Sequence, residues 1–145
     1  MDQVVSRRFD ELTALEFHDL LRLRCDVFVV EQECAYPELD GNDTAPGTEH
    51  HWIEADDGVV CCARTLTGPD GSVRIGRVAT AATARRAGWA AEMVTALVAR
   101  YPGSNIVLDA QSHLVGWYER LGFEASGDEF VEDGIPHVPM QLSRS

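Results

Sequence analysis

Apolar and polar positions alternate along the first part of the chain in a pattern that predicts one strand and one helix. Val4 to Phe9 has the composition of a short strand. Thr13-Ala14-Leu15-Glu16 then has the spacing of a capping box, which starts helices. The helix is predicted to continue to about Glu31, because its apolar residues recur at helical spacing: Phe17, Leu20, Leu21, Val27 and Phe28.

A long loop and three strands are predicted for the middle of the chain. From Glu33 to His50, Pro, Gly, Asn, Asp and Thr supply turns but no apolar periodicity. Long loops inside compact domains are often functional. Three strands follow, of which the first two form a hairpin around the turn Asp56-Asp57-Gly58: His51 to Ala55, Val59 to Leu66 and Val73 to Thr80.

Two further helices and three further strands are predicted for the rest of the chain. Apolar residues recur at helical spacing after Gly88 until Pro102-Gly103 ends the helix. A second helix is predicted to be capped by Ser112 and ended by Gly122, which suits a left-handed conformation. The strands are predicted at Asn105 to Ala110, Phe123 to Val131 and His137 to Leu142.

This order of elements predicts a single domain over residues 1–145, of the α+β or mixed-sheet α/β class. The 145 residues suffice for one core without disulfide or metal support. A sheet of this order leaves an edge strand, through which two copies could pair as a homodimer.

Composition and charge exclude several classes of partner. The net charge of -12 argues against a nucleic-acid partner, because that affinity comes mainly from clustered Lys and Arg. No apolar stretch approaches the ~20 residues that span a bilayer, and the N-terminus lacks the apolar region of a secretory signal. We therefore expect a cytoplasmic protein without a membrane partner.

The sequence gives no pattern typical of a metal site. The four cysteines form no CxxC pair, and the neighbours Cys61 and Cys62 would point to opposite faces of a strand, so free thiols are expected. Asp40, Asn42 and Asp43 lack the full spacing and terminal Glu of a calcium-binding EF-hand. We predict no metal.

The stretch VATAATARRAGWAAEMV carries the first chemical signal. An apolar strand ends, a turn of small residues follows, and Arg85-Arg86-Ala87-Gly88-Trp89-Ala90 opens a helix. Free backbone N–H groups at a helix start form an anion site, and Gly88 lets a phosphate approach the main chain. The alternative is a purely structural strand-turn-helix junction in which Gly88 relieves crowding.

A second motif downstream makes the pair specific. The six residues match the R/Q-x-x-G-x-G/A signature of the GNAT acetyltransferases, and IVLDAQSHLVGWYERLGF resembles that family's later strand and helix with its terminal Tyr-x-x-x-Gly-Phe. The resemblance implies an acetyl-CoA-dependent acyltransferase in which Arg85, Arg86, Ala87, Gly88, Trp89 and Ala90 hold the CoA pyrophosphate.

The same resemblance implies further roles along the cofactor. Two strands would splay apart around the pantetheine arm, which would lie along Val78, Ala79 and Thr80. A backbone N–H near Val78 would stabilise the oxyanion of the tetrahedral intermediate, where one such donor is worth ~3 kcal/mol. Gln111 falls where many relatives have an Asn that seats the cofactor.

Tyr118 and one histidine are the candidates for acid and base. Tyr118 falls where the family places a tyrosine that protonates the leaving thiolate, and a phenol with a pKa of about 10 can donate at neutral pH. The alternative is a buried aromatic on an amphipathic helix. An attacking ammonium must lose a proton, and we place His51 and His137 ahead of the other candidate bases, Glu31, Glu33 and His50.

The chain resembles the ElaA branch of the GNAT superfamily from about Phe9 to Met140, through LRLRCDVFVVEQECAYPELDGNDTAPGTEHHWIEADDG and EDGIPHVPM. That resemblance implies an acceptor cleft formed by Phe28, Glu31, Gln32, Cys34, Tyr36, Glu38 and Asp40. The acidic cleft suggests a cationic amine, either a small molecule or a protein amine. A non-catalytic CoA-binding module and a transferase of longer acyl chains remain alternatives.

Overall fold

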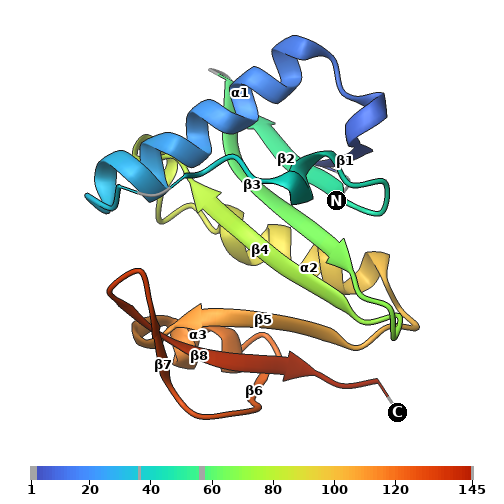
Figure 1. The fold of residues 1–145 in the computed structure, drawn as a ribbon, viewed down its shortest axis with the longest axis vertical. Coiled ribbons are helices and arrows are strands. Elements are labelled where there is room, and N and C mark those ends of the chain that lie inside the picture. Colours follow the sequence, from blue (N-terminus) through green and yellow to red (C-terminus); the bar gives the residue numbers. More distant parts are fainter. Residues whose placement is uncertain (1–2, 36, 56–57, 145) are drawn as a thin grey trace.

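The computed structural model describes residues 3–35, 37–55 and 58–144 and contains one mixed sheet (Figure 1). Its strand order is β1-β2-β3-β4-β5-β8-β6, and β7 pairs with the start of β8. The strands are β1 (Val4–Arg8), β2 (Glu49–Ala55), β3 (Gly58–Thr67), β4 (Val73–Thr80), β5 (Ile106–Gln111), β6 (Glu124–Ala125), β7 (Phe130–Glu132) and β8 (Ile135–Leu142). This architecture confirms the predicted mixed-sheet α/β class.

The helices cover both faces of the sheet (Figure 1). Helix α1 (Ala14–Cys25) packs Leu20 and Leu23 with Trp52 and Cys62 on one face. Helices α2 (Trp89–Arg100) and α3 (Val115–Glu119) pack on the other face, where Met93 belongs to the same buried cluster as Cys61. The two adjacent cysteines therefore point to opposite faces, as the strand period predicts.

The N-terminal helix begins as predicted and ends in an unusual way. The Glu16 N–H donates to Thr13 Oγ1 over 3.0 Å, and the Thr13 N–H donates to Glu16 Oε1 over 2.9 Å, which is a complete capping box. Helix α1 then continues as the π-helix η2 (Asp26–Glu31). Such π-segments are rare and occur frequently at functional sites.

The sheet opens between its two central strands. Within the described residues, β4 and β5 run parallel and pair only at Val73 with Ile106 and at Arg74 with Val107. Beyond Arg74 the strands diverge, which Figure 1 shows as the gap between the yellow-green and orange arrows. The splay that the family resemblance implied is therefore present.

Strand β4 also carries a β-bulge at this opening. Cys62 pairs with Ala79 and Arg64 pairs with Gly76, so two steps along β3 oppose three along β4. The extra residue is accommodated at Arg77, whose φ of 54° is left-handed. Sequence patterning did not indicate this bulge.

Two predictions for the last third of the chain were wrong. Ser112 does not cap a long helix: its hydroxyl donates to Glu129, residues Ser112–Leu114 form a short 3-10 turn, and α3 has only five residues. The predicted strand from Phe123 to Val131 is two short strands, β6 and β7, because the polar stretch between them leaves the sheet. Gly122 does adopt the predicted left-handed conformation, with a φ of 101°.

Candidate functional site

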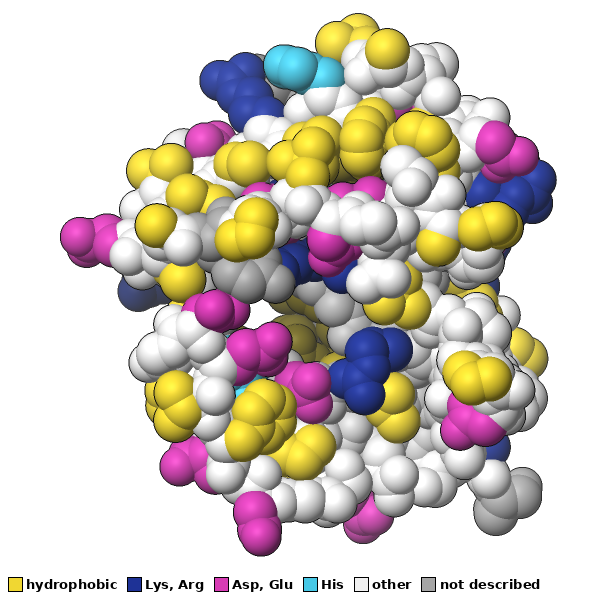
Figure 2. Space-filling model, viewed as in Figure 1, with side chains coloured by type: hydrophobic (Ala, Val, Ile, Leu, Met, Phe, Trp, Pro, Cys, Tyr) yellow, Lys and Arg dark blue, Asp and Glu magenta, His cyan; other side chains and the backbone are white. Residues whose placement is uncertain are grey.

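The divergence of β4 and β5 opens a cleft of about 890 Å³. Figure 2 shows this face of the molecule hollowed, with Asp and Glu side chains gathered along one lip of the hollow. One half of the cleft is formed by the end of β4, the start of α2 and α3. The other half is formed by η2, the loop after it, the start of β4 and the β7–β8 turn.

The start of α2 is an anion site by its geometry. Gly88 is the N-cap residue with a φ of 82°, and Arg86 before it is also left-handed, with a φ of 69°. The first N–H groups of α2 have no intrahelical partner, as at every helix start. A Cβ placed on Gly88 would meet nothing within 4 Å, so the space beside the main chain is open. The residues present therefore fit a phosphate group.

Tyr118 projects from α3 into the same cleft. Its side chain packs edge-to-face against Trp117 and Phe123, with ring centroids 4.8 and 5.9 Å away. Burial raises the pKa of Tyr118 to about 12, with a smaller contribution from nearby Cys61. The phenol therefore remains protonated at neutral pH and can donate a proton, although the same residue is also part of the core.

His137 lines the cleft from β8, opposite Gln111 in the β5–β8 register. Its Nδ1 lies 2.8 Å from the Ile135 carbonyl oxygen. A carbonyl oxygen only accepts, so Nδ1 carries the proton, and Nε2 of the neutral ring keeps its lone pair. The ring also stacks on Phe130, with centroids 5.7 Å apart. The side chain is thus fixed with a basic nitrogen available.

Comparison with known proteins identifies the fold. The model of an acetyltransferase (GNAT) domain matches residues 23–144. The chain belongs to the GNAT acetyltransferase family. Its members of known structure include an acyl-CoA N-acyltransferase from Pseudomonas aeruginosa, which is 34% identical with a TM-score of 0.87 and aligns over 97% of this chain and 99% of that one.

The relatives also place the chain in the ElaA branch of the GNAT family. Protein ElaA of Escherichia coli is 35% identical over 136 residues, which are 90% of this chain and 89% of ElaA. The crystal structure of Escherichia coli ElaA superimposes with a TM-score of 0.86 over 99% of this chain and 100% of that one. A UPF0039 protein of Mycobacterium tuberculosis is 44% identical over 134 residues, 90% of this chain and 86% of the relative.

Membership of the GNAT family sets the general chemistry. This fold binds acyl-CoA, and the family transfers acyl groups to amine acceptors. Among the described residues, no group of three or more His, Cys, Asp or Glu side chains could hold a metal ion, and no helix is long and apolar enough to cross a membrane. All four cysteines are free, and burial raises the pKa of Cys61 to about 11 and of Cys62 to about 12, so these two thiols are protonated.

An ion pair joins the two halves of the GNAT cleft. Arg85 of the phosphate loop donates to both carboxylate oxygens of Glu31 on η2, and its Nε and Nη2 donate to the Thr80 carbonyl oxygen over 3.2 and 3.1 Å. The hydrogen bonds from Arg85 lower the pKa of Glu31. Glu31 is therefore an ionised carboxylate held at the junction of the phosphate loop and the acceptor side.

The acceptor half of the cleft is lined by arginines that are matched with carboxylates. Arg64 donates to Asp40 over 2.8 Å and to Asp43 over 3.0 Å, and Arg74 donates to Asp109 over 3.1 Å. The β7–β8 turn adds two more carboxylates to the lining, Glu132 and Asp133. The whole lining holds five carboxylates and five arginines, but Arg85 and Arg86 belong to the phosphate loop. The acceptor half has four carboxylates (Asp40, Asp109, Glu132 and Asp133) and three arginines (Arg64, Arg74 and Arg77).

His51 does not reach the cleft. It lies fully buried on β2, where Nδ1 is 2.7 Å from Ser6 Oγ and Nε2 is 2.9 Å from Thr65 Oγ1. Burial lowers the pKa of His51 to about 3. Both ring nitrogens are occupied inside the core, so the expectation of a base at His51 is corrected: the residue is structural.

The structure brings most of the other expected residues to the cleft lining: Val78, Ala79, Thr80, Arg85, Arg86, Gly88, Trp89, Ala90, Gln111, Phe28, Glu31, Gln32 and Cys34. Ala87 is in the loop but not in the lining, and Tyr36 lies outside the described residues. Sequence reasoning missed Arg64, Arg74 and Arg77. The signal in the sequence was three arginines within two strands that are otherwise largely apolar.

Proposed function

We propose that this protein is an acetyl-CoA-dependent N-acetyltransferase that acts on a cationic amine of a small molecule or protein. The observation that carries the proposal is one cleft in which a phosphate-binding helix start, a bulged strand, Tyr118 and His137 Nε2 meet. Each of these supplies one requirement of acyl transfer: cofactor binding, oxyanion stabilisation, proton donation and proton removal.

The reaction proceeds by direct transfer in this proposal. The acceptor ammonium gives one proton to His137 Nε2, and its nitrogen attacks the thioester carbonyl carbon to form a tetrahedral intermediate. A backbone N–H near Val78 stabilises the oxyanion. The C–S bond then breaks, the nitrogen loses its second proton to water, Tyr118 donates its proton to the leaving thiolate, and the neutral amide and free CoA are released. Proton exchange with water restores both side chains.

The cofactor residues follow from the same geometry. The main-chain N–H groups from Arg86 to Ala90 bind the pyrophosphate, and Val78, Ala79 and Thr80 line the pantetheine arm. Gln111 lies at the end of β5, beside His137, where its amide can contact the same arm. Phe28, Gln32 and Cys34 form the acceptor wall, and the carboxylates of Glu132 and Asp133 beside Cys34 favour a positively charged acceptor.

The test is turnover of acetyl-CoA with a panel of amines, monitored by release of the CoA thiol. We expect acetylation of at least one amine, with kcat reduced about 100- to 10,000-fold in Tyr118→Phe and in His137→Gln, the scale of a lost general acid or base. His51→Gln is the matched histidine control, and its folded fraction should keep kcat. Saturable acetyl-CoA binding without turnover of any amine would contradict catalysis and indicate a binding module. Faster turnover of a longer acyl-CoA would correct the donor.

A further inference from the structure

Arg77 holds a backbone conformation that a side chain ordinarily avoids. It is a non-glycine residue with a φ of 54°, at the bulge of β4 and directly before Val78. L-residues enter this region at a cost in free energy, because Cβ crowds the following carbonyl. Such conformations persist only where the surroundings over-determine them, and they cluster at functional sites. Something in the structure must therefore hold Arg77 in place.

Among the residues that the structure describes, Glu38 and Phe28 contact the Arg77 side chain. Its Nε lies 3.4 Å from Glu38 Oε2, and its guanidinium lies 5.0 Å from the centroid of the Phe28 ring. A guanidinium over an aromatic face is attracted by the ring quadrupole. One further contact holds the main chain, since Cys62 Sγ lies 3.8 Å from the Arg77 carbonyl oxygen. The bulge is thus fastened through both side chain and backbone.

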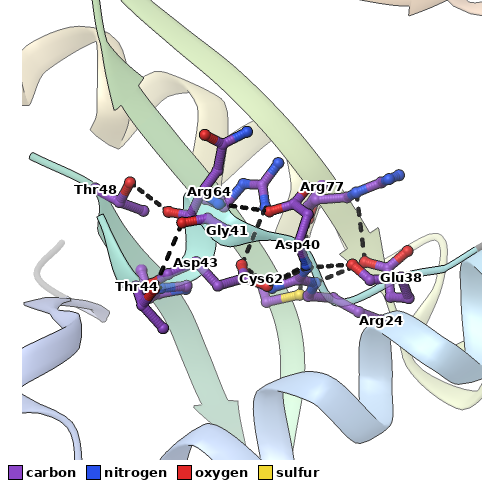
Figure 3. Close-up of polar contacts among 12 residues, drawn as sticks. Arg24, Glu38, Asp40, Gly41, Asp43, Thr44, Thr48, Cys62, Arg64 and Arg77 are labelled. Carbon is purple, nitrogen blue, oxygen red and sulfur yellow. Dashed lines mark hydrogen bonds and ion pairs between the residues drawn. The ribbon is translucent and has the colours of Figure 1, made fainter. Parts of the chain in front are cut away.

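Glu38 is itself anchored in a buried ion network (Figure 3). Its side chain is 2% exposed, and Oε2 accepts from Arg24 Nε over 2.8 Å. Arg24, also 2% exposed, binds Asp43 as well, over 2.8 Å. Figure 3 shows Arg77 reaching down from β4 to Glu38, with Arg24 below it and Asp43 and Arg64 to the side. Glu38 and Asp43 of the acidic loop between η2 and β2 are therefore both paired with Arg24, and Glu38 lies against the bulge through Arg77.

We propose that Arg77, gripped by Glu38 and Phe28, is a positioning residue that aims the Val78 N–H at the oxyanion. This inference rests on the proposed acyl transfer. It gives a role to the acidic loop, because Glu38 of that loop and Phe28 form a clamp on Arg77, and this clamp fixes the oxyanion donor. A bulge re-aims the groups that follow it, and the clamp keeps that aim fixed. Preorganised donors stabilise developing charge without reorganising during the reaction.

The test uses three substitutions at one position. Arg77→Gly removes the clamp but permits the same φ without strain, because glycine has no Cβ. Arg77→Ala removes the clamp and keeps the strain. Arg77→Lys keeps a charge that can pair with Glu38 but loses the planar stacking on Phe28. We measure kcat, the KM of the amine and the Kd of CoA. Free CoA has no thioester carbonyl oxygen, so its binding does not depend on the oxyanion donor.

The proposal predicts a loss in kcat alone. Arg77→Gly and Arg77→Ala should lower kcat about 10- to 100-fold, because small misplacements of catalytic groups have effects of that size. The Kd of CoA should stay within about twofold of wild type, and Arg77→Lys should retain more activity than Arg77→Gly. An unchanged kcat in Arg77→Gly, or a rise confined to the KM of the amine, would overturn the proposal in favour of a purely structural or acceptor-binding arginine.

NMR relaxation of the Val78 N–H provides a readout that needs no turnover. The clamp predicts a lower order parameter for the Val78 N–H in Arg77→Gly, with unchanged order parameters in the core of α2 as the internal control. An unchanged order parameter at Val78 would overturn the clamp even in an active enzyme. A wild-type protein that acetylates no amine would instead refute the proposed function, while the relaxation data would still decide whether Arg77 orders the bulge.

Discussion

Replacing Asp43 by Asn should strongly destabilise the protein. The Asp43 carboxylate is 2% exposed and accepts three hydrogen bonds from guanidinium groups, two from Arg24 at 2.8 and 3.2 Å and one from Arg64 at 3.0 Å. Asn keeps one oxygen but loses the charge and the second acceptor, while Arg24 remains buried. Each charge-assisted hydrogen bond contributes about 1.5–3 kcal/mol, and breaking a buried ion pair costs about 3–5 kcal/mol.

We therefore expect a loss of about 3–5 kcal/mol in the free energy of unfolding. For a chain of this size each kcal/mol lowers Tm by about 2–4 °C, which gives a decrease of roughly 6–20 °C. Urea denaturation at pH 7, followed by far-ultraviolet circular dichroism, measures the free energy of unfolding, and calorimetry measures Tm. The matched control is Asp109→Asn, whose pair with Arg74 is half exposed and should change stability by less than about 1 kcal/mol.

The pH dependence provides an independent check. Burial would raise the pKa of Asp43, but the hydrogen bonds and charges of Arg24 and Arg64 outweigh burial and hold that pKa below its ordinary value of 3.8. The stabilisation is therefore complete above pH 3.8 and is lost as the pH falls below it. The difference in the free energy of unfolding between wild type and Asp43→Asn should therefore decrease as the pH falls below 3.8. A gap under about 1 kcal/mol at pH 7 would refute this account of the network.

Two further predictions concern ionisable groups elsewhere. Because burial lowers the pKa of His51 to about 3 from 6.5, the unfolded chain binds the proton first, so the free energy of unfolding should fall by up to about 1.4 kcal/mol per pH unit below pH 6.5. Urea titrations at pH 7.5, 6 and 5 measure this slope, and a flat profile would contradict it. Glu31→Gln frees Arg85 from an exposed ion pair and should tighten acetyl-CoA binding about two- to fivefold by calorimetry. Weaker binding would show that Glu31 instead holds Arg85 in a productive position.

Features that depend only on residues close together in the chain could be predicted from the sequence. The capping box at Thr13 and the left-handed Gly122 involve residues three or four positions apart, so their geometry follows from the local chain. The phosphate loop was predicted for the same reason, since Gly88 and the start of α2 are neighbours in sequence. The family resemblance then supplied the splay of two strands in the middle of the sheet.

Features set by distant contacts could not be predicted in this way. The bulge at Arg77 depends on contacts with Glu38 and Phe28, which are 39 and 49 positions away in the numbering. The acidic loop has the composition of a solvated turn, yet Glu38 and Asp43 are buried, because Arg24 approaches them from α1. Which histidine faces the cleft also depends on tertiary packing, and pattern alone did not separate His51 from His137.

Calorimetric titration with acetyl-CoA tests most directly whether the cleft between β4 and β5 is a cofactor site. We would compare wild type with Gly88→Glu, whose carboxylate would repel the pyrophosphate, and with Gly88→Ala, which shares the backbone strain at a φ of 82° but adds no charge. The account predicts saturable binding to wild type, retained in the alanine variant and abolished in the glutamate variant. Absence of binding to folded wild-type protein, or equal binding to all three, would contradict it.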